Sequence, residues 1–276
     1  MPAREYAPHQ LLAPYVHSFC ISERHFAAPH ATFDIFPDSM IELVWNIGAP
    51  CALVLPDRTF PLPACYAVGL LQSPLRITAE GLVQVVRARF YPWALQPIIG
   101  AFLRPTGLPS AAGLLWVAAE LLPPAPGPAA APHDGEWALE QLQRILLRQV
   151  LEASLDDAGA IQAARALIEQ HGDIALPALA HQLGLSERSL RRRFHSAIQA
   201  SPKEFARLAR FEYVCTSLWQ TPGIPLADIA LQAGYSDQAH MQREFRAFSG
   251  RTPRQFASDM RRLRALFAAG RNMQDA

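Results

Sequence analysis

The sequence predicts an α+β protein in which a β-rich domain with appended helices precedes an all-α domain. Three observations support this class. The chain of 276 residues is long enough for two domains. The first hundred residues carry a hydrophobic period of two, and the chain beyond about residue 160 carries a helical period. Half of the residues are hydrophobic and 18% are charged, which excludes a disordered chain.

Strand patterns mark the first hundred residues. Apolar residues alternate from Ile41 to Gly48, and a valine-rich run extends from Leu82 to Phe90. Helical patterns follow over Trp93 to Phe102 and over Ala111 to Leu122. We therefore expect a small β domain, with helices added after its strands.

Two segments divide the chain. Residues 123–135 contain five prolines and two glycines and almost no bulky side chain, so they predict a loop. A helical pattern then returns over Trp137 to Glu152, and the turn-forming run Asp156-Asp157-Ala158-Gly159 follows it. We expect a regulatory domain at 1–155 and a second domain at 160–276.

The apolar face of the Trp137 to Glu152 helix has two interpretations. Leu142, Ile145 and Leu146 recur by threes and fours, as in a short coiled-coil seam between two copies of the chain. The same face would serve equally for packing on the β domain. A homodimer through this helix is therefore one of two open alternatives.

An internal repeat fills the second domain. Leu179-Ala180 and Gly184-Leu185-Ser186 reappear 50 residues later as Ile229-Ala230 and Gly234-Tyr235-Ser236. Further on, the matching positions are 51 residues apart: Phe194, Pro202 and Phe205 pair with Phe245, Pro253 and Phe256. One supersecondary unit therefore occurs twice.

Residue types identify the repeated unit as a helix-turn-helix. A small alanine lets two helices cross closely, a glycine ends the first helix in a left-handed conformation, and Ser186 or Ser236 caps the second helix. We place the units at 176–195 and 226–248. Between them, residues 201–219 predict one connecting helix that starts with a Ser201–Glu204 capping box, and Thr252 with Gln255 fits a second capping box further on.

The second helix of each unit is the expected reader of DNA. With Leu190, Phe194, Met241 and Phe245 facing inward, polar side chains remain outside. Arginine pairs bidentately with guanine and glutamine with adenine in the major groove, although an arginine run alone could also be a solvated face. The candidate DNA-binding residues are Arg188, Arg191, Arg192, Gln238, His240, Gln242, Arg243 and Arg246.

Several of these motifs resemble the DNA-binding domain of the AraC/XylS family. The resemblance covers about Ala163 to Ser258 and is carried by Gly184-Leu185-Ser186, Gly234-Tyr235-Ser236-Asp237-Gln238, and Gly250-Arg251-Thr252-Pro253. It implies sequence-specific regulation of transcription, with double-stranded DNA as partner and RNA polymerase as a further candidate partner. Ala239 departs from the longer polar residue sometimes found there, so a base contact at that position is not expected.

The first half of the chain resembles an uncharacterised sensor-type domain that often precedes this DNA-binding domain. Phe36-Pro37-Asp38-Ser39, Glu42 to Gly48, and Arg89-Phe90-Tyr91-Pro92 carry this resemblance. It implies a cupin-like β structure with a regulatory role. We expect a small-molecule effector in an apolar pocket near Trp45 and Phe90, whose aromatic side chains would otherwise be plain core.

Charge is divided unevenly along the chain, although the net charge is only +1. Residues 1–150 carry 9 Arg against 11 acids, whereas residues 186–276 carry 15 Lys and Arg against 8 acids. A slightly acidic half and a basic half indicate that only one end meets a polyanion.

Other functions have weaker support in the sequence. An architectural DNA binder without an effector stays open, and so does a cysteine-dependent DNA alkyl-transfer repair protein. The latter needs an activated thiolate, yet Cys51 and Cys65 lie in apolar surroundings without an adjacent basic motif. The histidines lack metal-binding spacing. We expect no enzyme activity, metal or cofactor, and a cytoplasmic protein without a membrane span or secretory signal.

Overall fold

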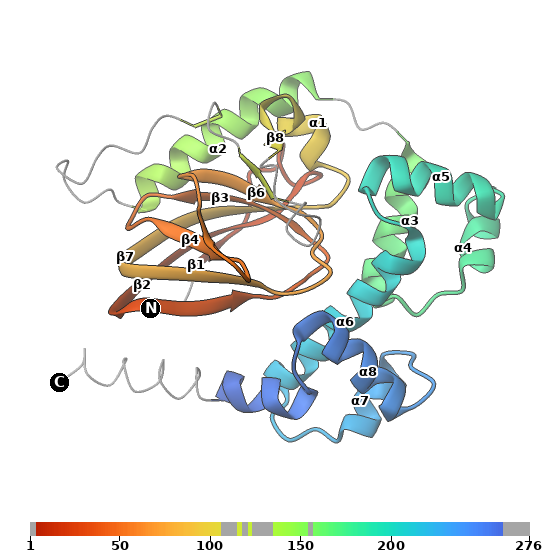
Figure 1. The fold of residues 1–276 in the computed structure, drawn as a ribbon. Helices are drawn as coiled ribbons and strands as arrows, with labels where there is room; N and C mark the ends of the chain where they lie inside the picture. Colours follow the sequence, from red (N-terminus) through yellow and green to blue (C-terminus); the bar gives the residue numbers. More distant parts are fainter. Residues whose placement is uncertain (1–3, 106–114, 118–120, 123–134, 154–156, 262–276) are drawn as a thin grey trace. The chain divides into compact units, whose positions relative to one another are not determined.

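A computed structural model describes residues 4–105, 115–117, 121–122, 135–153 and 157–261. The chain divides into two compact units (Figure 1). Unit 1 comprises Met1–Ile35, Met40–Leu71 and Leu75–Leu155, and unit 2 comprises Phe36–Ser39, Gln72–Pro74 and Asp156–Ala276. Unit 1 is built on an antiparallel sheet and unit 2 on helices, which confirms the α+β class. The predicted loop at 123–135 lies outside the described residues except for Gly135.

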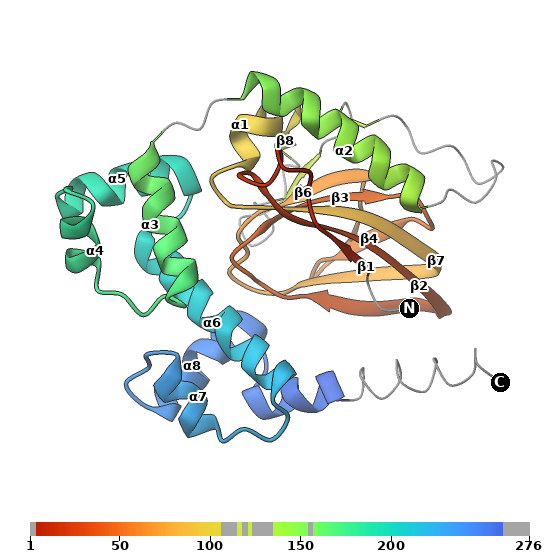
Figure 2. The same ribbon diagram turned by 180° about the vertical axis from the view of Figure 1, so that it is seen from behind.

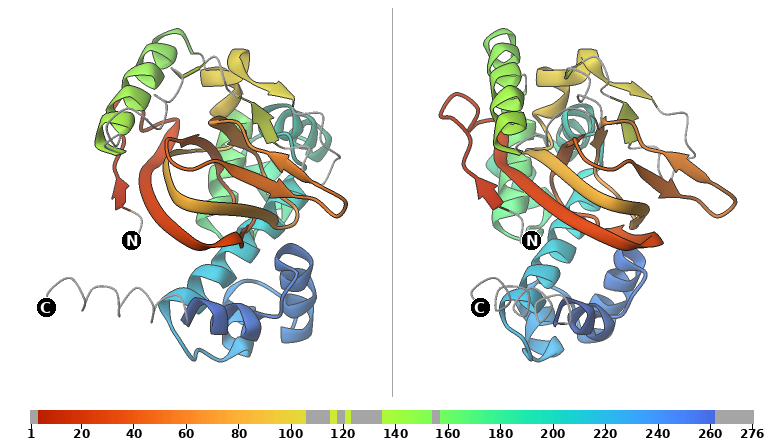
Figure 3. Two further views of the ribbon diagram at one scale, coloured as in Figure 1. Left: turned by 60° about the vertical axis from the view of Figure 1, so that its left-hand side comes forward. Right: turned by 90° about the vertical axis from the view of Figure 1, so that its left-hand side faces the viewer.

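One antiparallel sheet organises unit 1. Its strand order is β1-β2-β7-β3-β6-β9-β8, and β4 pairs with both β5 and β7. The long strands β2 and β7 run side by side and curve strongly (Figures 2 and 3). The strands are β1 (Arg4–Tyr6), β2 (Val16–Ile35), β3 (Ile41–Asn46), β4 (Cys51–Val54), β5 (Thr59–Pro61), β6 (Cys65–Val68), β7 (Leu75–Phe90), β8 (Arg104–Pro105) and β9 (Leu115–Val117).

Strand β3 is buried on both faces of this sheet. Trp45 lies opposite Val86 in the β3–β7 register, and its ring is 5.9 Å from that of Trp137 on helix α2 (Gly135–Glu152). Val44, the next residue along β3, faces the other way and packs in a second cluster with Tyr66. Because alternate residues of a strand face opposite sides, β3 contributes to two apolar layers, which explains its nearly continuous hydrophobic sequence.

Two helices were expected in unit 1 before residue 123, and the structure shortens one and corrects the other. The helical pattern over Trp93 to Phe102 is realised as α1 (Leu95–Ile99) and the 3-10 turn η1 (Gly100–Phe102). The helix expected over Ala111 to Leu122 is wrong at Leu115–Val117, which pair with β6 as strand β9. Aromatic and β-branched residues there favour a strand once a partner edge is available.

Helix α2 confirms the pattern that begins at Trp137, but the dimer seam proposed on it is wrong. Leu142 and Leu146 have no solvent exposure, because α2 packs on α1, β2 and β7 of its own unit. Ile145 beside them is half-buried. The apolar period therefore reports an intramolecular contact, the alternative that the sequence had left open.

Unit 2 arranges its helices around one long connector. Helix α6 (Pro202–Gln220) runs from one helix pair to the other (Figures 1 and 2). Its capping box at Ser201 and Glu204 is present as expected. Hydrogen bonds from Ser201 lower the pKa of the Glu204 carboxyl. The other helices are α3 (Ala158–Glu169), α4 (Leu176–Gln182), α5 (Glu187–Ile198), α7 (Leu226–Gln232) and α8 (Gln238–Ser249).

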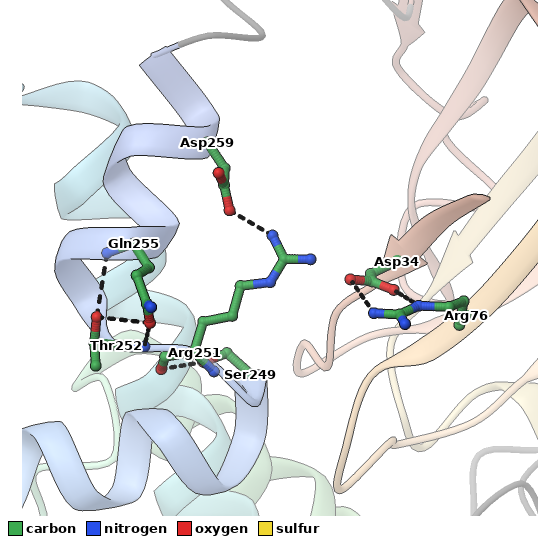
Figure 4. Close-up of polar contacts among 7 residues, drawn as sticks. All are labelled: Asp34, Arg76, Ser249, Arg251, Thr252, Gln255 and Asp259. Carbon is green, nitrogen blue, oxygen red and sulfur yellow. Dashed lines mark hydrogen bonds and ion pairs between the residues drawn. The ribbon is translucent and has the colours of Figure 1, made fainter. Parts of the chain in front are cut away.

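A further helical segment covers residues 253–261. Thr252 caps it: its hydroxyl accepts from the Gln255 backbone N–H, and the Gln255 side chain accepts from the Thr252 backbone N–H at 2.9 Å (Figure 4). The second capping box predicted from the sequence is therefore present, and Arg251 adds an ion pair to Asp259.

The turn after α3 packs against two other parts of unit 2. The His171 ring lies 4.3 Å from the Tyr213 ring of α6, and Gly172 packs so closely on α6 that a Cβ there would overlap the Ala206 carbonyl. The next residue, Asp173, touches Gly234 in the second helix-turn-helix. One turn thus contacts both the connector and the second helix pair.

Candidate nucleic-acid interface

Helices α4 and α5 form the first helix-turn-helix. Gly184 adopts a positive φ of 63°, and the following Leu185 N–H donates to the Ala180 carbonyl at 2.9 Å. The Ser186 hydroxyl accepts from the Ser189 N–H at 3.2 Å, which confirms it as the cap of α5. The turn and the cap together fix the direction in which α5 leaves α4.

Helices α7 and α8 repeat this geometry with one difference. Gly234 has a φ of 69°, and Tyr235 N–H donates to the Ala230 carbonyl at 2.9 Å. The prediction that Ser236 caps α8 is wrong, because the Asp237 side chain caps this helix by accepting a hydrogen bond from the His240 N–H at 2.7 Å. The second turn is one residue longer, which explains why the repeat shifts from 50 to 51 residues.

The outer face of α5 is strongly basic. Leu190 and Phe194 are buried as predicted, and the predicted readers are exposed: Arg188, Arg191 and Arg192. Arg191 also pairs with Glu187 one turn earlier, at 3.1 Å. Four arginines and one glutamate give this helix a net charge of +3.

The outer face of α8 is less charged. Met241 and Phe245 are buried, Arg243 and Arg246 are exposed, and Gln238 and Gln242 are half-buried at the edge of the same face. Two arginines and one glutamate leave a net charge of +1 on this helix. Amide side chains and fewer charges suit direct base readout more than phosphate attraction.

His240 lies apart from the other predicted readers of α8. Its Nδ1 is 3.1 Å from the Ser236 hydroxyl, its ring stands edge-on to Tyr235 with centroids 5.3 Å apart, and its Nε2 is 3.9 Å from Glu244 Oε1. Both ring nitrogens therefore face protein groups on the side of the helix. The structure groups Gln238, Gln242, Arg243 and Arg246 without it.

Sequence reasoning missed one residue of this surface. His195 on α5 is exposed and corresponds to Arg246 under the shift of 51 residues. The same shift pairs Arg188 with Ala239, Arg191 with Gln242, Arg192 with Arg243 and Arg193 with Glu244. Applying the shift to every outer position of the repeat would have found His195.

The candidate effector residues of unit 1 lie in its core. Trp45 and Phe90 have almost no exposure, so the structure places them as packing residues, and the pocket near them stays a prediction. Among the described residues, no group of three or more His, Cys, Asp or Glu side chains is placed to hold a metal ion. None of the described helices is long and apolar enough to cross a membrane.

Cys51, Cys65 and Cys215 are poorly suited to nucleophilic chemistry, whereas the Arg87 guanidinium lies 3.2 Å from the Cys20 sulfur. Cys20, Cys51 and Cys65 are buried. Burial raises the pKa of the Cys51 thiol and raises the pKa of Cys65 to about 12, and burial also raises the pKa of Cys215. A thiol that is neutral at physiological pH is a weak nucleophile, which weighs against alkyl transfer.

Comparison with known families matches each part of the chain separately. Residues 179–259 match a family described as a helix-turn-helix domain, and residues 4–105 match a domain of unknown function. Uncharacterized HTH-type transcriptional regulators of Staphylococcus aureus strains MSSA476 and MRSA252 are each 33% identical over 89 residues, or 32% of this chain. The aligned part is only 12% of the length of those relatives.

Solved structures share the fold. A crystal structure of ToxT from Vibrio cholerae O395, bound to (E)-4-(8-methylnaphthalen-1-yl)but-3-enoic acid, aligns with 88% of this chain and 99% of its own, with a TM-score of 0.50 and 13% identity. A second structure, of ToxT bound to an unsaturated fatty acid, covers 87% of this chain with a TM-score of 0.48 and 11% identity. At these identities the likeness concerns the fold alone.

Proposed function

We propose that this chain, whose residues 179–259 form an AraC-type helix-turn-helix domain, is a sequence-specific DNA-binding regulator of transcription without enzymatic activity. One observation carries the proposal: two capped reader helices, α5 and α8, present polar outer faces from opposite ends of a single connecting helix. The proposed base-reading residues are Arg188, Arg191, Arg192, Gln238, Gln242 and Arg243, with Arg246 on phosphate.

The length of the connector supports reading of one composite site. Helix α6 has 19 residues and spans about 28 Å at 1.5 Å per residue. Successive major-groove faces of B-DNA are about 34 Å apart. Because the two outer faces differ in chemistry, one chain should bind an asymmetric site with two boxes about one helical turn apart.

Spacing between the boxes tests this arrangement. The parent site is first selected from random double-stranded DNA with the full chain. Five added base pairs rotate one box by about half a turn, and following it would require DNA bending that costs several kcal/mol, so binding should collapse in a gel-shift titration. A ten-pair insertion, which restores rotation but not distance, is the control. If the site with five added base pairs bound as tightly as the parent site, only one of the two units could be reading DNA, and the two-box arrangement would be refuted.

We further propose that residues 1–155 form the regulatory domain and that a small-molecule effector acts there. ToxT, which shares the fold, has been solved with a naphthalenyl butenoic acid bound, so that compound is a defined first probe. Ligand binding to the folded state raises the melting temperature, which calorimetry measures. A chain lacking residues 1–155 should still bind the selected site but lose its response to inducing conditions, and an unchanged response would refute the regulatory assignment.

A further inference from the structure

A partly buried ion pair joins the connecting helix to the second reader helix. Arg207 Nε on α6 lies 2.6 Å from Glu244 Oε1 on α8, and only 32% and 15% of the two side chains are exposed. The Arg207 guanidinium also lies over the Phe248 ring, 5.3 Å from its centroid. Hydrogen bonding, charge and stacking therefore all fix Arg207 against one side of α8.

More polar groups surround this pair. The Arg210 guanidinium lies 5.5 Å from the centroid of the buried Tyr235 ring. Arg210 Nε, the Tyr235 hydroxyl and Glu244 Oε2 are buried and have no hydrogen-bond partner among the described residues. Burial raises the pKa of Tyr235, and the nearby Glu244 carboxylate raises it further. Such groups are costly in a protein interior, so their retention between two helices calls for a role other than stability.

His240 connects the ion pair to the first turn of the reader helix. Glu244 Oε1 is 3.9 Å from His240 Nε2, and His240 Nδ1 is 3.1 Å from the Ser236 hydroxyl in the turn. Glu244 also follows Arg243 directly in the sequence. The carboxylate thus contacts the connector, the first turn of α8 and the segment that carries the outer arginine.

Among the residues that the structure describes, the first reader helix has no equivalent arrangement. Arg193 occupies the position of Glu244, and its Nη1 lies 3.6 Å from Asp157 Oδ1 in a looser pair, with 44% and 24% of the side chains exposed. Apolar Leu185 follows the turn glycine where the second unit has Tyr235. Exposed pairs of this kind contribute little to stability, so among the described residues α5 is held mainly by its apolar side, which packs on α3.

We propose that Glu244, held by Arg207, is a positioning residue that fixes α8 for reading the second box, a role with no counterpart in α5. The inference rests on the proposed DNA-binding function. Bidentate contacts to a base require placement within about 0.5 Å, which apolar packing alone specifies less tightly than a directed ion pair does. Glu244 acts through Arg243 and Gln242, and it does not touch DNA itself.

The test is Glu244→Gln in the full chain, on the site that the parent protein selects from random DNA. Affinity is measured for that site and for versions with single base changes in each box. Discrimination at the second box should fall by about tenfold, while discrimination at the first box stays unchanged. The matched control is Asp157→Asn, which removes the charge paired with Arg193 and retains an amino acid that caps helices well; it should alter neither box.

A second variant separates positioning from folding, because Glu244→Gln leaves the partly buried Arg207 charge without its partner. Glu244→Gln combined with Arg207→Gln removes both charges and should regain thermal stability without regaining second-box discrimination. The inference would be overturned if Glu244→Gln lost discrimination equally at both boxes or lost none. It would also be overturned if the double variant discriminated at the second box as the parent does, or if both variants failed to fold. If the parent selects no site at all, the proposed function itself fails.

Discussion

The two helix-turn-helix units share their interiors and differ in their surfaces. Their inward positions match in size and burial: Leu190 corresponds to Met241, and Phe194 to Phe245. Their outer positions do not match, because Arg188 is replaced by Ala239 and Arg193 by Glu244. Buried positions decide whether the unit folds, whereas exposed ones are nearly free to change. A duplicated fold can therefore carry two different readers.

Local chemistry of the turns differs as well. Gly184 faces open space, whereas a Cβ on Gly234 would overlap the Asp173 carboxylate. The cap is a neutral serine in the first unit and an ionisable aspartate in the second. The second turn thus lies against a carboxylate whereas the first faces open space, so substitutions at equivalent turn positions should affect the two units unequally.

The largest effect is expected where one turn contacts both the connector and the second unit. Gly172→Ala places a Cβ on the backbone of Ala206 at a φ of 73°, so it should destabilise the domain by about 3 kcal/mol or more. Thermal melting measured by circular dichroism gives the change. Gly223→Ala, with a φ of 92° but open space around it, is the control for conformational strain alone. Equal losses in the two variants would mean that the contact with α6 has no energetic weight.

Equivalent arginines test whether both helices read bases. Arg243→Ala and Arg192→Ala should each lower specific affinity by about 1 to 3 kcal/mol and relax preference at one position, each in its own box. Arg246→Ala, nearer the end of α8, should weaken binding to all sequences alike. Gel-shift titration on selected and random DNA measures both effects. If Arg243→Ala lost equal affinity on both DNAs, Arg243 would not belong among the base readers.

The turn glycines give a smaller, paired prediction. Gly184→Ala should cost about 1 to 2 kcal/mol, the strain of a left-handed alanine. Gly234→Ala should cost more, because Asp173 must also move. Chemical denaturation of the two variants side by side measures the difference, and a smaller loss for Gly234→Ala would show that Asp173 does not restrain the second turn.

The caps give the smallest effect, one that depends on pH only in the second unit. Hydrogen bonding from the His240 backbone N–H lowers the pKa of Asp237. A carboxyl whose pKa is lowered in the folded state stabilises the fold above its unfolded pKa of about 3.9. This stabilisation is lost as the pH falls through the folded-state pKa. The melting-temperature difference between the parent and Asp237→Asn should therefore stay constant from pH 6 to about 5 and shrink as the pH falls below about 4. Ser186→Ala should cost about 1 kcal/mol at every pH, and a pH-dependent loss there would contradict the comparison.

Local patterns in the sequence predicted much of unit 2. The repeat, the turn glycines, the cap at Ser186 and the capping boxes at Ser201 and Thr252 were all recognisable, because each depends on residues at most a few positions apart. The resemblance to the AraC/XylS DNA-binding domain, which rested on the same residues, is confirmed. In the sequence, the extra residue in the second turn, before Asp237, was visible only because the spacing of the repeat changes from 50 to 51 residues.

Unit 1 was less predictable because its contacts are distant in sequence. Strand β9 depends on an edge offered by β6 nearly fifty residues earlier, and nothing within Leu115–Val117 specifies that partner. The period of Leu142 and Leu146 identified a buried face of α2 but not what buries it. Periodicity reports which side of an element avoids water, and it carries no information on the identity of the neighbour.

By itself, the sequence determined that this chain has a β-rich part, two capped helix-turn-helix units and a continuous connector, since propensity, capping and turn conformation act over a few residues. Only the tertiary structure decided that α2 packs on its own sheet and that Glu244 of α8 pairs with Arg207 of α6, which is 37 residues away in the chain. Those outcomes depend on which surfaces meet in space, and the free energy of such a meeting belongs to both partners together.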